Sequence, residues 1–268
     1  MADRRLIKEC LANPAMWPAA SLYAFKRWLG QEQIRIYRQG QVMYVGAQSG
    51  QGAWQAIAGL EYEPELRQIL TRVKAGDVIL DIGANIGSYT LRLARKTGPT
   101  GRVVSVEAMA KNAQFLEMNI KANHLANVTV VQAAVGATNS HVALYSKGHA
   151  SSIKLNAEGG FTQVGETEMV TGDSILDRLG LARLDWIKMD IEGGEPEALR
   201  GLSRALANFR PRILFENGPT GAETIALLKG IDYAVGCFSG AGQFMESSGT
   251  VSLGNLFALP LEKMAQIT

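Results

Sequence analysis

The chain has little of several features on which other classes of protein depend. Its 268 residues include only two cysteines, Cys10 and Cys237, which lie far apart in the sequence. A disulfide framework or a zinc site is therefore not expected, and the sequence predicts reduced thiols in a cytoplasmic protein. Lysine and arginine (27) barely outnumber aspartate and glutamate (25), and no run of basic residues is longer than two. This balance does not predict nucleic-acid binding.

Long apolar runs are also missing. The apolar stretch that follows the N-terminus is interrupted by Pro14 and Pro18 and then by Lys26 and Arg27. It is neither a secretory signal nor the ~20-residue run of a membrane-spanning helix. We expect residues 15–29 to form an amphipathic helix that packs on its own domain, and peripheral membrane contact is the alternative.

Residues 1–60 differ from the rest and are predicted to form a small N-terminal cap. Helices are expected near residues 3–12 and 18–29, and the alternating stretch "IRIYRQGQVMYVG" predicts a β-hairpin. Three of the four tryptophans lie in this segment: Trp17, Trp28 and Trp54. We expect these aromatic side chains to pack the cap onto the main domain. A wall that faces the substrate is the alternative.

Residues 61–268 show short aliphatic strands that alternate with helices. This alternation predicts βαβ units in a doubly wound, mostly parallel α/β sheet. Five parallel strands are expected, at residues 78–82, 103–107, 128–133, 186–190 and 212–216. The runs "DYAVGCF" and "NLFALPLE" predict a final hairpin with an antiparallel strand at or near one edge. The expected sheet therefore has seven strands.

A glycine turn joins the first strand to its helix. The stretch "VILDIGANIGSYT" places Asp81, Gly83, Asn85 and Gly87 at this junction, and the second strand ends on Glu107. An acid at the tip of the second strand can bind both hydroxyls of a ribose, which predicts an adenosine-type ligand. The glycines do not follow the G-x-G-x-x-G spacing of dinucleotide-binding proteins. A carboxylate at Asp81 would repel a pyrophosphate and suits a ligand that carries an ammonium or sulfonium group.

With the stretch "IKMDIEGGE" added, the chain resembles the FkbM family of S-adenosylmethionine-dependent methyltransferases, which have the Rossmann-like class I fold. The resemblance covers roughly residues 61–260, and the D-x-E-G-x-E motif is its most specific part. It implies that Gly83, Asn85 and Gly87 hold the methionine part of the cofactor and that Glu107 holds the ribose. By the same resemblance, Met109 and Ala133 contact the adenine. Tyr62 and Glu63 fall where the family's preceding helix comes near the cofactor.

Acidic residues gather at the ends of the fourth and fifth strands. Glu195 and Glu197 are explained by the helix N-terminus at Pro196, whereas Asp190 and Glu192 precede that helix. Asp190, Glu192 and Glu216 are therefore the candidate catalytic groups that assist deprotonation of the acceptor. His149 is the minority alternative as a base. Lys188, inside the fourth strand, is expected to pair with a carboxylate.

The acids also resemble the metal site of catechol-type O-methyltransferases. Oxygen ligands suit Mg²⁺, so Asp190, Glu216 and Asn217 form a candidate magnesium site. The alternative is that the same oxygens bind hydroxyl groups of the substrate. The sequence does not decide between these two interpretations.

The resemblance implies an S-adenosylmethionine-dependent O-methyltransferase. Its expected partner is a small hydroxyl-bearing metabolite such as a sugar or a polyketide, with neither a nucleic acid nor a membrane span. Two alternatives remain at this stage: a nucleotide (NAD)-dependent oxidoreductase on a similar sheet, and a non-catalytic protein that binds an adenosine ligand. The acceptor and the oligomeric state are not encoded in any recognisable motif.

Overall fold

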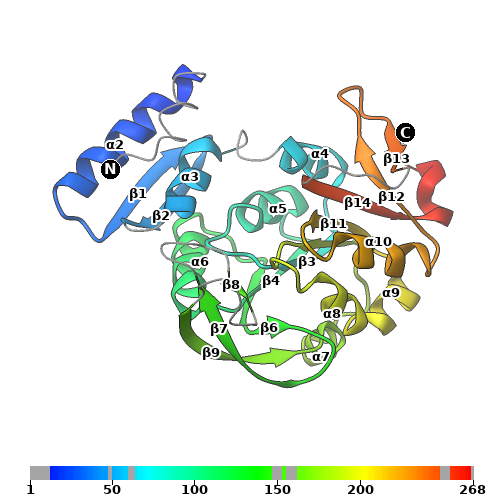
Figure 1. The fold of residues 1–268 in the computed structure, drawn as a ribbon. Coiled ribbons are helices and arrows are strands. Elements are labelled where there is room, and N and C mark those ends of the chain that lie inside the picture. Colours follow the sequence, from blue (N-terminus) through cyan, green and yellow to red (C-terminus); the bar gives the residue numbers. More distant parts are fainter. Residues whose placement is uncertain are drawn as a thin grey trace.

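A mostly parallel sheet forms the centre of the molecule. The computed structural model describes residues 13–47, 50–59, 64–146, 153–154, 162–247 and 254–266. Within this part of the chain, eight strands form one sheet in the order β13-β12-β14-β11-β10-β3-β4-β5 (Figure 1). In chain order, these strands are β3 (Val78–Ile82), β4 (Arg102–Glu107), β5 (Val128–Gln132), β10 (Trp186–Met189), β11 (Arg212–Asn217), β12 (Tyr233–Phe238), β13 (Phe244–Glu246) and β14 (Gly254–Pro260). The five predicted parallel strands match β3, β4, β5, β10 and β11 to within one residue at each end.

The predicted α/β class is confirmed, but the end of the sheet differs from the expectation. The two strands of the predicted final hairpin, β12 and β14, do pair antiparallel near one edge, and β14 lies between β12 and β11, to which it is also antiparallel. The short strand β13 adds an eighth strand beyond β12, and the chain continues after β14 into the 3-10 helix η3 (Leu261–Gln266). Strand insertion of this kind depends on pairing between distant segments, which a local hydrophobic pattern does not specify.

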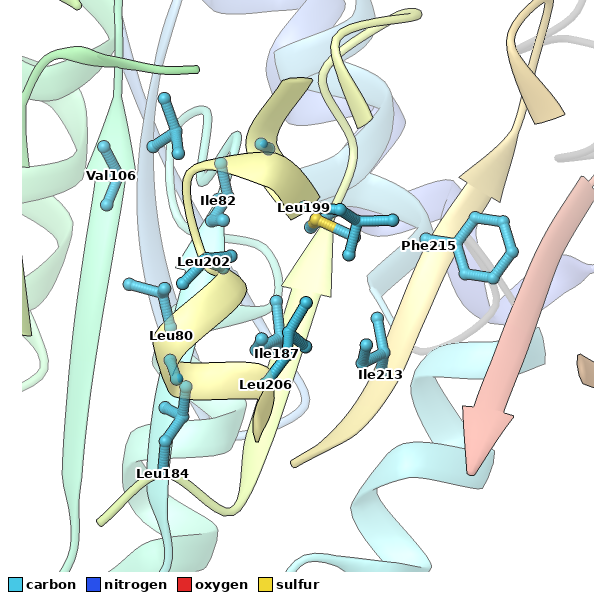
Figure 2. Close-up of a cluster of buried hydrophobic side chains, with 14 of the residues drawn as sticks. Leu80, Ile82, Val106, Leu184, Ile187, Leu199, Leu202, Leu206, Ile213 and Phe215 are labelled. Atoms are coloured by element: carbon cyan, nitrogen blue, oxygen red, sulfur yellow. The ribbon is translucent and has the colours of Figure 1, made fainter. Parts of the chain in front are cut away.

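Helices cover both faces of the central sheet. One face is covered by α7 (Gly172–Arg178), α8 (Glu195–Arg200), α9 (Ser203–Phe209) and α10 (Gly221–Lys229). The other face is covered by α4 (Pro64–Arg72) and α5 (Thr90–Thr97). Figure 2 shows leucines of α8 and α9 and of the turn between them against aliphatic side chains of the sheet. Because successive strand residues point to opposite faces, Leu80 and Ile82 join this first cluster and Ile79 joins the second.

A smaller sheet lies beside the central one. Its order is β6-β9-β7-β8, and its strands are β6 (Ala134–Val135), β7 (Ser140–Ser146), β8 (Ile153–Lys154) and β9 (Thr162–Val170). The long strands β7 and β9 pair antiparallel, with a register shift between Leu144 and Tyr145. This sheet was not predicted, because β9 is mostly polar and exposed and so lacks a hydrophobic pattern.

The N-terminal segment contains the predicted helix and hairpin. Its elements are η1 (Pro14–Met16), α2 (Trp17–Trp28), β1 (Gln33–Arg38), β2 (Gln41–Gly46) and α3 (Gly50–Ala58). The helix expected at residues 3–12 lies outside the described residues. The buried side chains of this segment share one hydrophobic cluster with Ile86, Leu91 and Phe115 of the main domain. The boundary near residue 60 stays a prediction.

Two asparagines of α6 (Ala110–Ala122) and its C-cap fasten the hairpin to the main domain. The Asn119 side chain accepts a bond from the Tyr44 amide (2.5 Å) and donates to the carbonyls of Tyr44 (3.2 Å) and Ile86 (2.8 Å). One turn later, Asn123 accepts from the Val42 amide (3.0 Å) and donates to the Val42 carbonyl (2.6 Å). The two side-chain amides therefore satisfy the backbone of β2 at the edge that β1 does not occupy.

The aromatic residues of the cap do not all pack inward as predicted. Tyr23 and Trp54 are buried, but Trp17, Phe25 and Trp28 are exposed. The prediction was therefore wrong for two of the three tryptophans in this segment. No helix among the residues that the structure describes is both long enough and apolar enough to cross a bilayer.

Candidate active site

A cleft opens where β3, β4 and β10 end. Its empty space is about 740 Å³, part of it open to solvent. In open α/β sheets, ligands bind at the carboxyl ends of the strands, which is the position of this cleft. Six of the predicted site residues line it: Gly83, Asn85, Glu107, Ala133, Asp190 and Glu192.

The glycine turn between β3 and α5 forms the floor of the cleft. Gly83 has φ +75°, and a Cβ atom there would lie 2.0 Å from the carbonyl oxygen of Asp190. Asn85 also has a left-handed backbone, with φ +51°, which asparagine tolerates better than most residues. Gly87 has φ +100° and does not line the cleft; a Cβ atom there would lie 2.8 Å from the side chain of Leu116. The turn is thus held in contact with the end of β10, so Gly83 has a structural requirement for glycine as well as its predicted ligand role.

Glu107 closes the end of β4 and joins the turn to the next loop. Its Oε2 accepts a bond from the Asn85 amide (2.9 Å), and its Oε1 accepts bonds from the Met109 amide (2.9 Å) and the Asn112 side chain (3.3 Å). Burial raises the pKa of the Glu107 carboxyl above its ordinary value, and these three hydrogen bonds oppose that shift. Glu107 is thereby fixed in orientation at the wall of the cleft.

The predicted adenine contacts are only partly brought together. Ala133 lines the cleft, whereas Met109 does not and contributes its backbone amide to Glu107. Asn112, from α6, and Leu144, from β7, also line the cleft and were missed by the sequence analysis. Asn112 lies five residues after Glu107 on the following helix, a spacing that could have identified it. Leu144 comes from the unpredicted sheet, so no local pattern pointed to it.

Asp81 lies beneath the cleft rather than in its lining. It is fully buried, accepts a 2.6 Å bond from the Thr90 hydroxyl and lies 3.5 Å from the Lys188 ammonium. Lys188 also donates to the Gly83 carbonyl (2.9 Å) and lies 3.7 Å from the Asp190 carboxylate. The expected pairing of Lys188 with a carboxylate is therefore present. One buried ammonium connects Asp81, the glycine turn and the acid at the end of β10.

The acids that follow β10 have different environments. Glu195 is buried; its Oε1 accepts from the Ile191 amide (3.2 Å) and its Oε2 from the Thr220 hydroxyl (3.1 Å). This carboxylate thus stabilises the turn at the start of α8. Glu192 lines the cleft with a left-handed backbone, φ +55°. Such a conformation is uncommon for a residue with a side chain and is often found at functional sites.

Glu216, at the end of β11, carries a strongly perturbed carboxyl group. Burial, followed by the nearby charges of Asp190, Glu192 and Glu195, raises its pKa to about 8. Its Oε2 atom is buried and forms no hydrogen bond. A carboxyl group with these surroundings is largely protonated at neutral pH. Glu216 does not line the cleft wall itself but lies beside Asp190 on the neighbouring strand.

The candidate magnesium site is not supported by this arrangement. Glu216 and Asn217 are consecutive in β11, so their side chains point to opposite faces of the sheet. Consistent with this, Asn217 is buried against Gly221 at the start of α10. Among the residues that the structure describes, no group of three or more histidine, cysteine, aspartate or glutamate side chains could hold a metal ion.

Some predicted site residues lie outside the described part of the chain. These are Tyr62 and Glu63, which were expected near the cofactor, and His149, the alternative base. Their roles stay predictions.

Comparisons with known proteins identify the family of the chain. A profile of the family described as "Methyltransferase FkbM domain" matches residues 81–234, more than half of the 268-residue sequence. The matched span runs from β3 to β12 and contains all the described residues that line the cleft. No curated protein matches the chain.

Several solved structures are similar to the chain at low sequence identity. Methyltransferase FkbM from Methylobacillus flagellatus KT is 18% identical, with a TM-score of 0.47, over 94% of this chain and 60% of its own. Precorrin-6y C5,15-methyltransferase from Geobacter metallireducens GS-15 is 16% identical, with a TM-score of 0.44, over 73% of this chain and 84% of its own. Aeropyrum pernix fibrillarin, solved with natively bound S-adenosyl-L-methionine, is 13% identical, with a TM-score of 0.42, over 85% of this chain and 82% of its own.

Proposed function

The chain belongs to the FkbM family of S-adenosylmethionine-dependent methyltransferases, and from this premise we propose that it methylates a hydroxyl oxygen of a small metabolite such as a sugar or a polyketide. The observation that carries the proposal is the charge of the cleft. Carboxylates of Glu107, Asp190 and Glu192 line it, and no lysine, arginine or histidine is found among its described lining residues. This environment favours a ligand that carries ammonium and sulfonium groups and opposes the pyrophosphate of a dinucleotide.

The residues present fit S-adenosylmethionine. We assign Glu107 to the ribose hydroxyls, because it is an oriented acceptor at the tip of the second parallel strand. The apolar side chains of Val106, Ala133 and Leu144 provide a surface for the adenine ring. Asn85 and Gly83, on the floor of the cleft, are assigned to the methionine part. The cofactor supplies an activated methyl group, so the protein mainly has to position the two reactants.

The acceptor is assigned to the side of the cleft formed by Asp190 and Glu192. Transfer to a hydroxyl forms an O–C bond and breaks the C–S bond of the sulfonium, and the hydroxyl proton must pass to a base. Glu192 is the preferred base, because the Asp190 carboxylate already pairs with the Lys188 ammonium at 3.7 Å. Glu216 lies beside Asp190, and because its pKa is raised to about 8, its carboxyl group is largely protonated at neutral pH. A directly bound hydroxyl is preferred over a magnesium ion, since Asn217 lies on the other face of β11.

Calorimetric titration with S-adenosylmethionine, S-adenosylhomocysteine and NAD tests the ligand class. We expect the first two to bind and NAD not to bind. The variant Glu107→Ala should weaken cofactor binding by ~2 to 4 kcal/mol, since two charge-assisted hydrogen bonds to the ribose would be lost. Glu117→Ala, an exposed acid on the following helix, is the matched control and should bind normally.

The methyl-transfer step needs a separate readout. Incubation with labelled S-adenosylmethionine and panels of sugars and polyketides should give a product whose label is lost on cleavage of a methyl ether. Binding of NAD in preference to S-adenosylmethionine would overturn the ligand assignment. A labelled product in which the methyl group is on nitrogen or carbon would overturn the O-methylation assignment while leaving the cofactor assignment intact.

A further inference from the structure

Helix α2 presents an apolar face to solvent. Trp17 is 47% exposed, Phe25 56% and Trp28 79%, and Leu22 and Leu29 are exposed as well. The rings of Phe25 and Trp28 lie 6.2 Å apart and nearly stack on each other. Monomeric proteins rarely expose several large apolar side chains side by side unless they form an interaction site.

The exposed side chains occupy one continuous side of the helix. At about 100° per residue, Trp17, Trp28, Phe25, Leu29 and Leu22 fall within roughly 140° of the helix circumference. The opposite side carries Ala19 and Tyr23, which are buried against the hairpin. Helix α2 is therefore apolar on both sides but covered on only one. A helix that is apolar all round normally has both sides covered.

The position of α2 leaves this face accessible. The helix lies at the periphery of the molecule, next to β1 and away from the central sheet (Figure 1), and none of its residues is among the described residues that line the cleft. Its outward face is therefore not part of the site described above.

The charges around this face are basic. Helix α2 contains Lys26 and Arg27 and no acidic residue. Residues 13–47 contain four basic side chains and a single acidic one, Glu32, which gives a net charge of +3. Arg35 and Tyr37 are exposed on the neighbouring strand β1. At the same 100° per residue, Lys26 lies about 40° beyond one end of the apolar arc and Arg27 about 80° beyond the other.

This combination discriminates between possible occupants. A second copy that docked through the same face would supply an apolar surface, but its α2 has no acid to pair with Lys26 and Arg27. An anionic bilayer surface supplies both an apolar layer and negative headgroups. Aromatic residues with flanking lysine and arginine are the usual composition of helices that lie in such an interface.

We propose that α2 docks the protein on an anionic lipid surface, with Trp17, Phe25 and Trp28 inserted among the headgroups and Lys26 and Arg27 at the phosphate level. The helix lies in the plane of the interface and does not cross the bilayer. The active-site cleft lies elsewhere in the molecule, so docking leaves it open to an acceptor.

Co-sedimentation of the full chain with vesicles tests the proposal. One set of vesicles contains phosphatidylcholine alone, and the other contains phosphatidylcholine mixed with phosphatidylserine. Preferential binding to the mixed vesicles, weakened by added salt, is expected because exposed charges are screened. The double variant Phe25→Ser/Trp28→Ser should lower the partition coefficient about tenfold or more, given the apolar area that it removes. Arg27→Glu should lower binding to the mixed vesicles only.

Matched controls separate docking from misfolding. Leu261→Ser removes an exposed apolar side chain on η3, outside the α2 face, and should bind vesicles as the wild type does. Circular dichroism and S-adenosylmethionine binding should be unchanged in all variants. The proposal is overturned if the wild type ignores the mixed vesicles, binds both kinds equally, or is unaffected by Phe25→Ser/Trp28→Ser. A lipid-free dimer in analytical ultracentrifugation that this double variant dissociates would assign the face to self-association instead.

Discussion

The buried ammonium of Lys188 is expected to be the most costly single charge to remove from this protein. Its side chain is 5% exposed, that of Asp81 is 0% exposed, and Nζ lies 3.5 Å from the Asp81 Oδ1. The same Nζ donates to the Gly83 carbonyl at 2.9 Å. The variant Lys188→Met keeps most of the side-chain volume and removes only the charge and the hydrogen bonds.

The size of the effect follows from this geometry. At an effective dielectric constant of about 20, two charges 3.5 Å apart attract by about 5 kcal/mol, and desolvation of the ammonium offsets part of that gain. Breaking a buried pair leaves the other charge without compensation, which typically costs about 3 to 5 kcal/mol. We therefore expect Lys188→Met to lower the free energy of unfolding by about 3 to 5 kcal/mol.

Urea unfolding followed by circular dichroism measures this change. The double variant Asp81→Asn/Lys188→Met removes both charges, so it should lose less stability than the sum of the two single variants, with a coupling of about 2 kcal/mol or more. Arg183→Met is the matched control. Its guanidinium lies only 2.7 Å from Asp185 but is 59% exposed, so the loss should stay below about 1 kcal/mol. Additive single variants, or equal losses for Lys188→Met and Arg183→Met, would refute the reasoning from burial.

Three further predictions concern the cleft. Burial and nearby acids raise the pKa of Glu216 to about 8. Relative to the wild type, Glu216→Gln should therefore leave the free energy of unfolding unchanged below pH 4.5 and raise it progressively up to about pH 8, by roughly 1 to 3 kcal/mol after solvent screening. Thermal melts across this pH range measure the difference. Asp190→Asn and Glu192→Gln should each lower turnover about 100-fold with cofactor affinity within a few fold in calorimetry, and wild-type activity should survive a chelator. Gly83→Ala forces a Cβ atom to 2.0 Å from a backbone oxygen and should destabilise the fold by at least ~3 kcal/mol, unlike Gly165→Ala, which has open space.

The strands of the central sheet could be predicted because each is specified by its own residues. Runs such as Val78–Ile82 are short, aliphatic and bounded by glycine and polar turns, so the pattern and its ends are local. The insertion of β14 between β11 and β12 and the sheet around β7 and β9 depend on pairing between distant segments. No short window of sequence contains that information, so these features were missed.

The candidate site shows the same division. Glu107, Asp190 and Glu192 were found because the ends of parallel strands meet at one edge of the sheet. The placement of Asp81 beneath the cleft was not foreseen. A parallel strand is covered on both faces, so its apolar residues do not reveal which face a given side chain joins. The separation of Glu216 from Asn217 was foreseeable, since consecutive strand residues always point to opposite faces.

The dense charge of residues 190–197 can be divided by what each carboxylate contacts. Glu195 holds the Ile191 amide and the Thr220 hydroxyl, so its charge is used within the turn. Asp190 lies near Lys188, and the same ammonium donates to the Gly83 carbonyl of the glycine turn. Glu192 remains in the cleft wall, in a strained backbone conformation that the surrounding turn must enforce. Since one buried lysine contacts both the glycine turn and the first acid, the geometry of the proposed cofactor side and that of the proposed acceptor side depend on the same ammonium group.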